Sequence, residues 1–125
     1  MKKILLLLTV ISLSSFQEMI DLPPGAFYKK IMNTPNAVIL DVRTKEEAAN
    51  GHLPGAVLLN YREDKFEKQI SELDKTKIYF VYCGNGVRSD QAIDLMEKQG
   101  FTKYYNLIGG FKAWKADGLD YVEDK

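Results

Sequence analysis

The stretch from Lys77 to Ala92 reads KIYFVYCGNGVRSDQA, and it decides the fold class of this 125-residue chain. Residues 77–82 form an apolar run typical of a buried strand, and residues 83–88 form a loop that contains two glycines. Residues 89–92 then open an amphipathic helix. This order of strand, loop and helix is the repeating unit of a parallel sheet.

The rest of the chain continues the alternation of strands and helices. Further strands are expected at residues 37–42, 57–60 and 104–107, and helices at 21–32, 44–49, 64–73 and 111–117. Asp21 is expected to cap the first of these helices, whose apolar face would include Phe27, Tyr28, Ile31 and Met32. Thr44 and Glu47 match a capping box at the start of the second helix, and Ser89 is expected to cap the helix after the Cys83 loop. Gly109 and Gly110 are expected to break the chain before the last helix, and the tail after Tyr121 is expected to be loose. Together the elements predict an α/β domain whose mainly parallel central sheet is flanked by helices on both faces.

Cys83 is the only cysteine of the chain, and it directly follows the strand at residues 77–82. Ligands of parallel sheets bind at the carboxyl ends of the strands. Loop N–H groups, the helix N-terminus and the Arg88 guanidinium would all stabilise a negative charge at this point. Gly84 and Gly86 allow the positive φ values that turn successive N–H groups inward. We therefore predict a lowered pKa for the Cys83 thiol.

A lone cysteine has three ordinary explanations. It can be buried and inert, it can pair with another molecule, or it can be a working thiol. The glycine-containing loop and Arg88 favour the working thiol here.

Charge is balanced, with 17 Lys and Arg against 17 Asp and Glu. This balance argues against nucleic acid or an anionic membrane surface as a partner. A local basic site remains compatible with a neutral chain.

The first residues have a different composition. Met1, Lys2 and Lys3 give a basic start, an apolar run follows from Ile4 to Leu13, and residues 14–17 are mostly small or polar. This layout predicts a secretory signal peptide over residues 1–16, followed by one mature domain over residues 17–125. The run is shorter than the ~20 residues that cross a bilayer, so membrane contact is expected only during export. An uncleaved anchor and a buried N-terminal helix are the alternatives. Export would place the domain in the periplasm or outside the cell.

Four segments of the chain resemble the rhodanese domain, in the order and with the gaps of that family. They are residues 41–43 (DVR), 51–56 (GHLPGA), 83–89 (CGNGVRS) and 109–114 (GGFKAW). The resemblance extends over roughly residues 17–120, and the size is similar to that of single-domain sulfurtransferases. The expected signal peptide makes the chain most similar to the small exported, periplasmic members. It implies a rhodanese-like fold and transfer of a sulfane sulfur from thiosulfate or a persulfide donor to a thiol or to cyanide.

The resemblance also implies a role for each site residue. Cys83 would be the nucleophile and would carry the sulfur as a persulfide, with no metal and no organic cofactor. Asp41 would be structural near the site, and Arg43 would either pair with it or face the substrate. His52 would lie in a structural turn, although a Cys–His pair is conceivable. The expected substrate-binding residues are Gly84, Asn85, Gly86, Val87, Arg88, Ser89 and Arg43.

Loop length separates the competing activities of this fold. Four residues lie between Cys83 and Arg88, whereas related phosphatases have one more residue in the corresponding loop. The shorter loop favours sulfur transfer over a phosphatase or arsenate reductase. A persulfide carrier that turns over thiosulfate poorly is the other alternative. Both the enzyme and the carrier would use Cys83, a small sulfur donor and a thiol acceptor.

Overall fold

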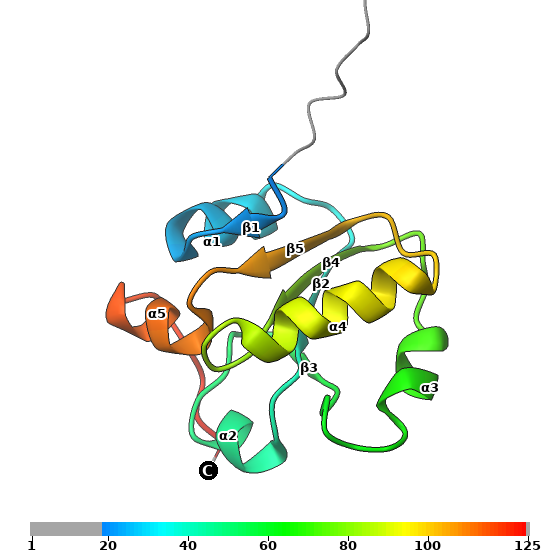
Figure 1. The fold of residues 1–125 in the computed structure, drawn as a ribbon. Helices are drawn as coiled ribbons and strands as arrows, with labels where there is room; N and C mark the ends of the chain where they lie inside the picture. The colour runs from blue at the N-terminus through cyan, green and yellow to red at the C-terminus, as the bar shows by residue number, and fades with distance from the viewer. Residues whose placement is uncertain (1–18, 125) are drawn as a thin grey trace, which may run out of the picture.

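The computed structural model describes residues 19–124, so the signal-peptide prediction for residues 1–16 lies outside the described part. The strands are β1 (Asp21–Leu22), β2 (Ala37–Asp41), β3 (Val57–Leu58), β4 (Ile78–Tyr82) and β5 (Tyr104–Leu107). The helices are α1 (Pro24–Met32), α2 (Lys45–Ala49), α3 (Phe66–Ser71), α4 (Val87–Lys98) and α5 (Gly110–Ala116). Figure 1 shows these elements on the ribbon.

The five strands form one sheet in the order β1-β5-β4-β2-β3, and each neighbouring pair is parallel. β4 is therefore the central strand, with β2 and β5 on its two sides. Its residues are almost all buried, as its continuous apolar sequence predicts for a strand covered on both faces. The carboxyl end of β4 leads directly into the Cys83 loop.

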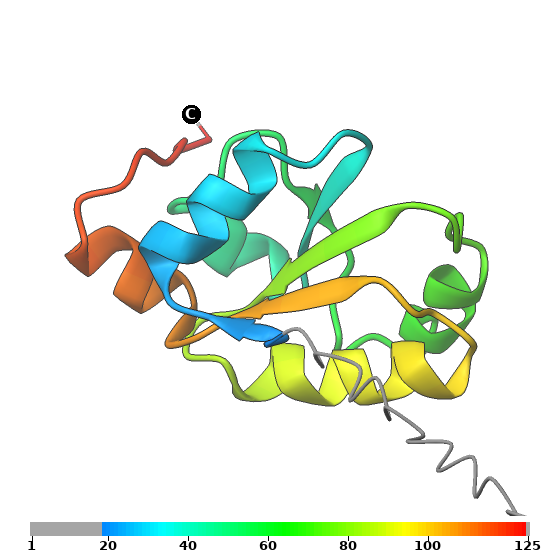
Figure 2. The ribbon, with the colours of Figure 1, turned by 90° about the horizontal axis from the view of Figure 1, so that it is seen from above.

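Each face of the sheet carries its own hydrophobic core. One core includes Phe27 of α1 and Trp114 of α5, which pack on Phe80 and Leu107 of the sheet. Figure 2 shows α1 on one side of the strands and α4 on the other. The second core is formed by residues of α3 and α4 against the opposite face, namely Phe66, Ile70, Ala92, Ile93 and Met96 packed on Leu40, Tyr79 and Val81. These cores confirm the prediction of a parallel sheet with helices on both faces.

Two expectations for the first helix are wrong. Asp21 and Leu22 form β1 beside β5, and α1 begins after Pro23, which provides no side-chain cap. Proline at the first position of the helix has no N–H, so one backbone donor that would need an acceptor is absent. Tyr28 and Met32 are exposed. The side of α1 that packs on the core is therefore formed by the buried Phe27 and the partly buried Ile31.

The C-terminal tail is also more ordered than expected. Val122 forms an antiparallel bridge with His52, and each residue's N–H donates to the other's carbonyl oxygen at 2.9 Å. The backbone N–H of Asp124 donates to the Ala49 carbonyl at 3.0 Å. The prediction of a loose tail is wrong because these backbone groups find partners in the last residue of α2 and in the turn after it.

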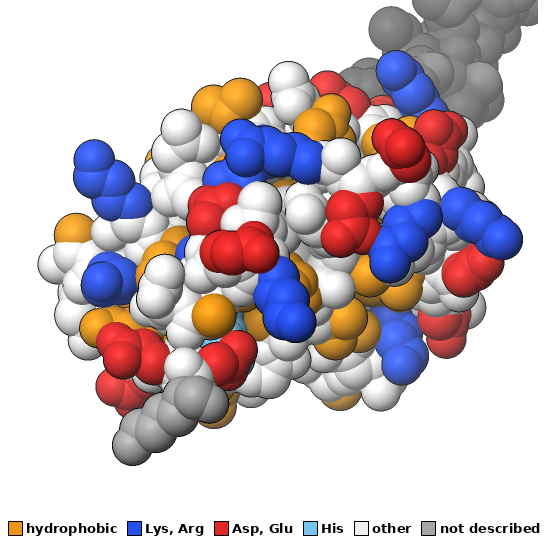
Figure 3. Space-filling model, turned by 90° about the horizontal axis from the view of Figure 1, so that it is seen from below, with side chains coloured by type: hydrophobic (Ala, Val, Ile, Leu, Met, Phe, Trp, Pro, Cys, Tyr) orange, Lys and Arg blue, Asp and Glu red, His pale blue; other side chains and the backbone are white. Residues whose placement is uncertain are grey.

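The surface agrees with the balanced charge of the sequence. On the face shown in Figure 3, basic and acidic side chains are interspersed. Among residues 19–124, none of the helices has the length and apolar character that a bilayer crossing requires. The same residues contain no cluster of His, Cys, Asp and Glu suited to a metal ion.

Candidate active site

Cys83 lies immediately after the carboxyl end of β4, the central strand, as the sequence predicts. It is a free cysteine and is fully buried at the base of its loop. The thiol therefore lies at the edge of the parallel sheet where the strands end and where ligands usually bind.

The loop directs hydrogen-bond donors at the sulfur. The Gly86 N–H donates to the Cys83 Sγ at 3.1 Å, and the Ser89 Oγ lies 3.4 Å from the same atom. Gly86 has a φ of 100° and stands at the N-cap of α4, so this helix begins at Val87 rather than at Ser89. The Asn85 side-chain oxygen accepts from the Val87 N–H at 3.1 Å and fixes the turn into the helix.

These contacts determine the acidity of the thiol. Burial raises the pKa of Cys83, but hydrogen bonds from the Ser89 hydroxyl and from the N–H groups of Ser89, Asn85 and Gly86 outweigh burial. The net pKa is below the ordinary value, as expected from the sequence. The Ser89 hydroxyl also lies 3.2 Å from the Gly86 carbonyl oxygen. Its single proton can bond the carbonyl beside a neutral thiol and turn to the sulfur of a thiolate.

α5 holds the base of the loop by backbone contact. The Phe111 N–H donates to the Cys83 carbonyl at 2.7 Å, and the Lys112 N–H donates to the Gly84 carbonyl at 3.1 Å. Gly110 makes this approach possible, because a Cβ there would lie 2.5 Å from the Cys83 carbonyl oxygen. Its φ of 61° is also in the left-handed region. The sequence marked Gly110 only as a break before a helix.

Arg88 is anchored to α2 by Glu47, and its contact with a substrate stays a prediction. Its two terminal nitrogens donate to the two carboxylate oxygens of Glu47 at 2.7 and 2.8 Å. The hydrogen bonds from Arg88 lower the pKa of Glu47 from 4.5 to about 2. Glu47 also completes the expected capping box with Thr44. This second role of Glu47 was missed by the sequence analysis.

Asp41 and Arg43 form a buried network under the loop. Asp41 accepts from the Arg43 N–H, Nε and Nη2 and from the Tyr82 hydroxyl, over 2.7 to 3.0 Å. The Arg43 Nη2 also reaches the Gly51 carbonyl at 2.7 Å, and its guanidinium lies over the Phe111 ring. With 3% of its surface exposed, Arg43 is positioned as a structural partner of Asp41. Contact between Arg43 and a substrate stays a prediction.

His52 is held away from the thiol. Its Nδ1 lies 3.0 Å from the Leu53 carbonyl oxygen, and its Nε2 lies 3.1 Å from an Asp124 carboxylate oxygen. These contacts raise the pKa of His52, chiefly through Leu53, although burial opposes them. The ring therefore connects the turn after α2 to the C-terminal tail, in agreement with a structural role.

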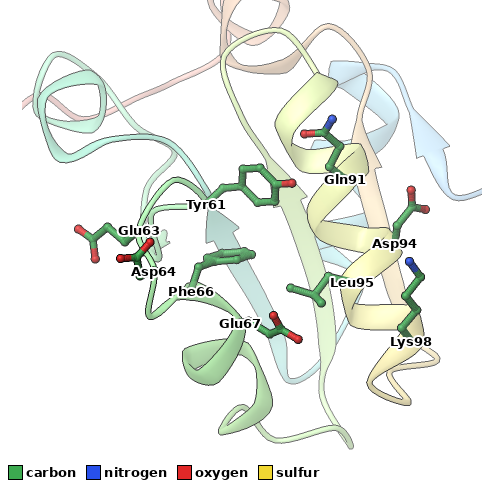
Figure 4. A pocket seen from close by; sticks show the side chains of 9 residues that line it. All are labelled: Tyr61, Glu63, Asp64, Phe66, Glu67, Gln91, Asp94, Leu95 and Lys98. Carbon is green, nitrogen blue, oxygen red and sulfur yellow. The ribbon is translucent and has the colours of Figure 1, made fainter.

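Two hollows lie near α4. One, of about 440 Å³, borders the Cys83 loop and is lined by Asn85, Gly86, Val87, Asp21, Asp90, Asn106, Ile108 and Gly109. The other, of about 510 Å³, lies between α3 and α4 and contains no residue of the loop. Figure 4 shows its aromatic and acidic lining, including Tyr61, Phe66 and Glu67. The first hollow is the one that borders the loop, although Cys83 itself does not line it.

Comparison with known proteins agrees with this arrangement. The family profile described as "Rhodanese-like domain" matches residues 25–117. A protein of Allochromatium vinosum named sulfurtransferase is 33% identical over 94 residues, covering 75% of this chain and 86% of its own length. The thiosulfate sulfurtransferase GlpE of Coxiella burnetii is 33% identical over 87 residues, covering 70% of this chain and 79% of its own.

Two further relatives extend the comparison. YrkF, a candidate sulfur carrier protein of Bacillus subtilis, is 37% identical over 89 residues, which cover 71% of this chain but only 47% of YrkF. The crystal structure of a rhodanese-like domain protein from Staphylococcus aureus is 31% identical, with a TM-score of 0.69 over 82% of this chain and 97% of that one. Sequence profile, relatives and fold agree, and the chain belongs to the rhodanese-like domain family.

Proposed function

We propose that this protein is a sulfurtransferase that carries a sulfane sulfur on Cys83 as a persulfide. The observation that supports this proposal is the cradle around the sulfur, where the Gly86 N–H lies 3.1 Å and the Ser89 Oγ 3.4 Å from the Sγ. Such donors stabilise the thiolate that attacks and the persulfide anion that forms.

The reaction has two transfers. The Cys83 thiolate attacks the outer sulfur of the donor, a new S–S bond forms, and the donor S–S bond breaks. Its electron pair leaves with sulfite when the donor is thiosulfate, or with a thiolate when the donor is a persulfide. An acceptor thiolate, or cyanide, then takes the outer sulfur and releases the Cys83 thiolate. Neither transfer needs a metal or an organic cofactor.

Steady-state turnover with thiosulfate and cyanide tests this proposal. We expect parallel double-reciprocal plots, because the donor product leaves before the acceptor reacts. Cys83→Ser should reduce the rate to background. A Cys83→Ser rate equal to that of the parent would contradict the proposal. Turnover of an aryl phosphate by the parent protein would instead support the phosphatase alternative.

The second candidate is a persulfide carrier that accepts sulfur from a partner and turns over slowly. The similarity to YrkF is the observation that favours it. A carrier would form the Cys83 persulfide in one step, yet it would release sulfur to small thiols far more slowly than it gained it. Separate measurement of the two half-reactions distinguishes the carrier from the enzyme.

We further propose that the protein is exported through a signal peptide at residues 1–16. The basic start and the short apolar run support this proposal. Expression of the full chain followed by mass analysis of the periplasmic fraction tests it. Recovery of the uncleaved chain in the cytoplasm alone would contradict it.

A further inference from the structure

The arginines beside the Cys83 loop are both paired with carboxylates. Arg88 meets Glu47 in a two-pronged contact of 2.7 and 2.8 Å. Arg43 is fully engaged below the loop with Asp41. Each pair has no net charge, so neither guanidinium offers an unshared positive charge to a donor.

The hollow beside the loop adds negative charge. Asp21 and Asp90 line it, and its lining contains no Lys or Arg. Val87 and Ile108, which are 58% and 46% exposed, supply apolar surface in the same place. An anion that entered by this hollow would therefore meet carboxylates and apolar side chains beside the loop.

The loop itself supplies only partial positive charge. Its donors are the N–H groups around Cys83 and the N-terminus of α4, which is equivalent to roughly half a positive charge. Attack of a thiolate on thiosulfate brings three negative charges together. Attack on a protonated alkyl persulfide, RSSH, involves only the charge of the thiolate. In a partly buried site this difference in charge is costly.

We propose that Glu47, by neutralising Arg88, makes the site selective for sulfane donors of low charge, protonated alkyl persulfides, over the thiosulfate dianion. This inference rests on the proposed function of Cys83. The favoured step converts Cys83–S⁻ and RSSH into Cys83–SSH and RS⁻. The outer sulfur keeps its proton, and the electron pair of the broken S–S bond leaves on RS⁻. Glu47 acts here as a positioning residue, through Arg88.

The rate at which each donor loads Cys83 tests the inference. Thiosulfate and 2-hydroxyethyl persulfide are mixed separately with the full chain, the reactions are quenched, and intact mass reports the fraction of persulfide. The readout is the ratio of the thiosulfate rate to the persulfide rate, because the ratio cancels any general change in thiol reactivity. Glu47→Gln keeps the shape and the capping box but frees the charge of Arg88. Glu46→Gln, an exposed neighbour on α2, is the matched control.

We expect Glu47→Gln to raise the ratio by about tenfold and Glu46→Gln to leave it within about twofold, since a distant exposed charge is screened. An unchanged ratio in Glu47→Gln, with both donors still loading Cys83, would overturn the inference and leave the proposed function intact. Failure of both donors to load the parent protein would overturn the proposed function and this inference with it.

Ionic strength gives a second test that needs no variant. The thiosulfate loading rate of the parent protein should not fall as salt is raised, because Glu47 already neutralises Arg88. The exposed Lys112, whose N–H donates to the Gly84 carbonyl, is the cation that could replace Arg88 for an anionic donor. A steep fall of the rate with salt would reveal such an attraction and would overturn the inference.

Discussion

Two arginine–carboxylate pairs lie near the Cys83 loop, and they differ in burial and in partners. The side chains of Asp41 and Arg43 are 0% and 4% exposed, whereas those of Glu47 and Arg88 are 35% and 17% exposed. Asp41 also bonds the Tyr82 hydroxyl, so the buried pair joins two central strands. The outer pair joins α2 to the first turn of α4.

The difference shows that the same chemical pair can serve two purposes. A buried pair is expensive to break, because the remaining charge loses both water and partner. A partly exposed pair contributes little to stability, because water can replace either partner. We therefore expect the Asp41–Arg43 pair to maintain the fold under the loop, and the Glu47–Arg88 pair to determine the charge that a donor meets.

The largest expected effect is on the free energy of unfolding when the carboxylate of each pair is replaced by an amide. Asp41→Asn should lower the free energy of unfolding by about 3–5 kcal/mol. Glu47→Gln, the matched change in the outer pair, should lower it by at most about 1 kcal/mol. Urea unfolding of both variants measures the difference. Equal losses would contradict the distinction between the two pairs.

A substitution at Gly110 tests the close contact between α5 and the backbone of the Cys83 loop. A methyl group there would meet the backbone of residues 83–85 and would also force a side chain into a φ of 61°. We expect Gly110→Ala to cost about 2–5 kcal/mol from strain and overpacking. Gly55→Ala is the control, because Gly55 has a φ of 78° but no atom within 4 Å of the added Cβ, and strain alone costs about 1–2 kcal/mol. Similar losses at both positions would argue against the close contact with α5.

The contribution of the Glu47–Arg88 pair to stability should depend on pH in the acid range. The hydrogen bonds from Arg88 lower the pKa of Glu47 from its ordinary value of 4.5 to about 2. The contribution of the pair is therefore complete above about pH 4.5 and is lost as the pH falls toward 2. The stability difference between the parent protein and Glu47→Gln should shrink over this window. A difference that is constant from pH 7 to pH 2.5 would mean that Glu47 is not held by Arg88.

The Ser89 hydroxyl should determine part of the acidity of the Cys83 thiol. Removal of its hydroxyl in Ser89→Ala takes away a hydrogen bond that favours the thiolate, so the pKa of Cys83 should rise. The midpoint of the pH profile of alkylation should then move to higher pH. Ser71→Ala, which removes an exposed hydroxyl on α3, should leave the midpoint in place. A midpoint unmoved by Ser89→Ala would exclude this role.

The position of Cys83 could be predicted because its signals are local. A buried strand, a glycine-containing loop and an amphipathic helix follow one another within residues 77–92. That pattern predicted the buried strand, whereas its central place in the sheet comes from the strand pairing. The capping box of Thr44 and Glu47 was visible for the same reason. The contact of Glu47 with Arg88 joins residues 41 positions apart, and only the packing of α2 against the loop creates it.

Other differences also arise from long-range pairing. β1 has two residues, too few for a periodic pattern, and it exists because Asp21 and Leu22 pair with β5. The order of the C-terminal tail depends on backbone bonds between Val122 and His52, which composition does not reveal. The start of α4 at Val87 follows from the positive φ of Gly86, where the sequence suggested Ser89 as a cap.

Intact-protein mass spectrometry tests the central claim most directly. The protein is treated with thiosulfate or with 2-hydroxyethyl persulfide, and its mass is measured before and after addition of a thiol. We expect the gain of one sulfur atom on Cys83, its reversal by the thiol, and no gain in Cys83→Ser. An unchanged mass of the parent protein with both donors would contradict the assignment of Cys83 as the sulfur carrier.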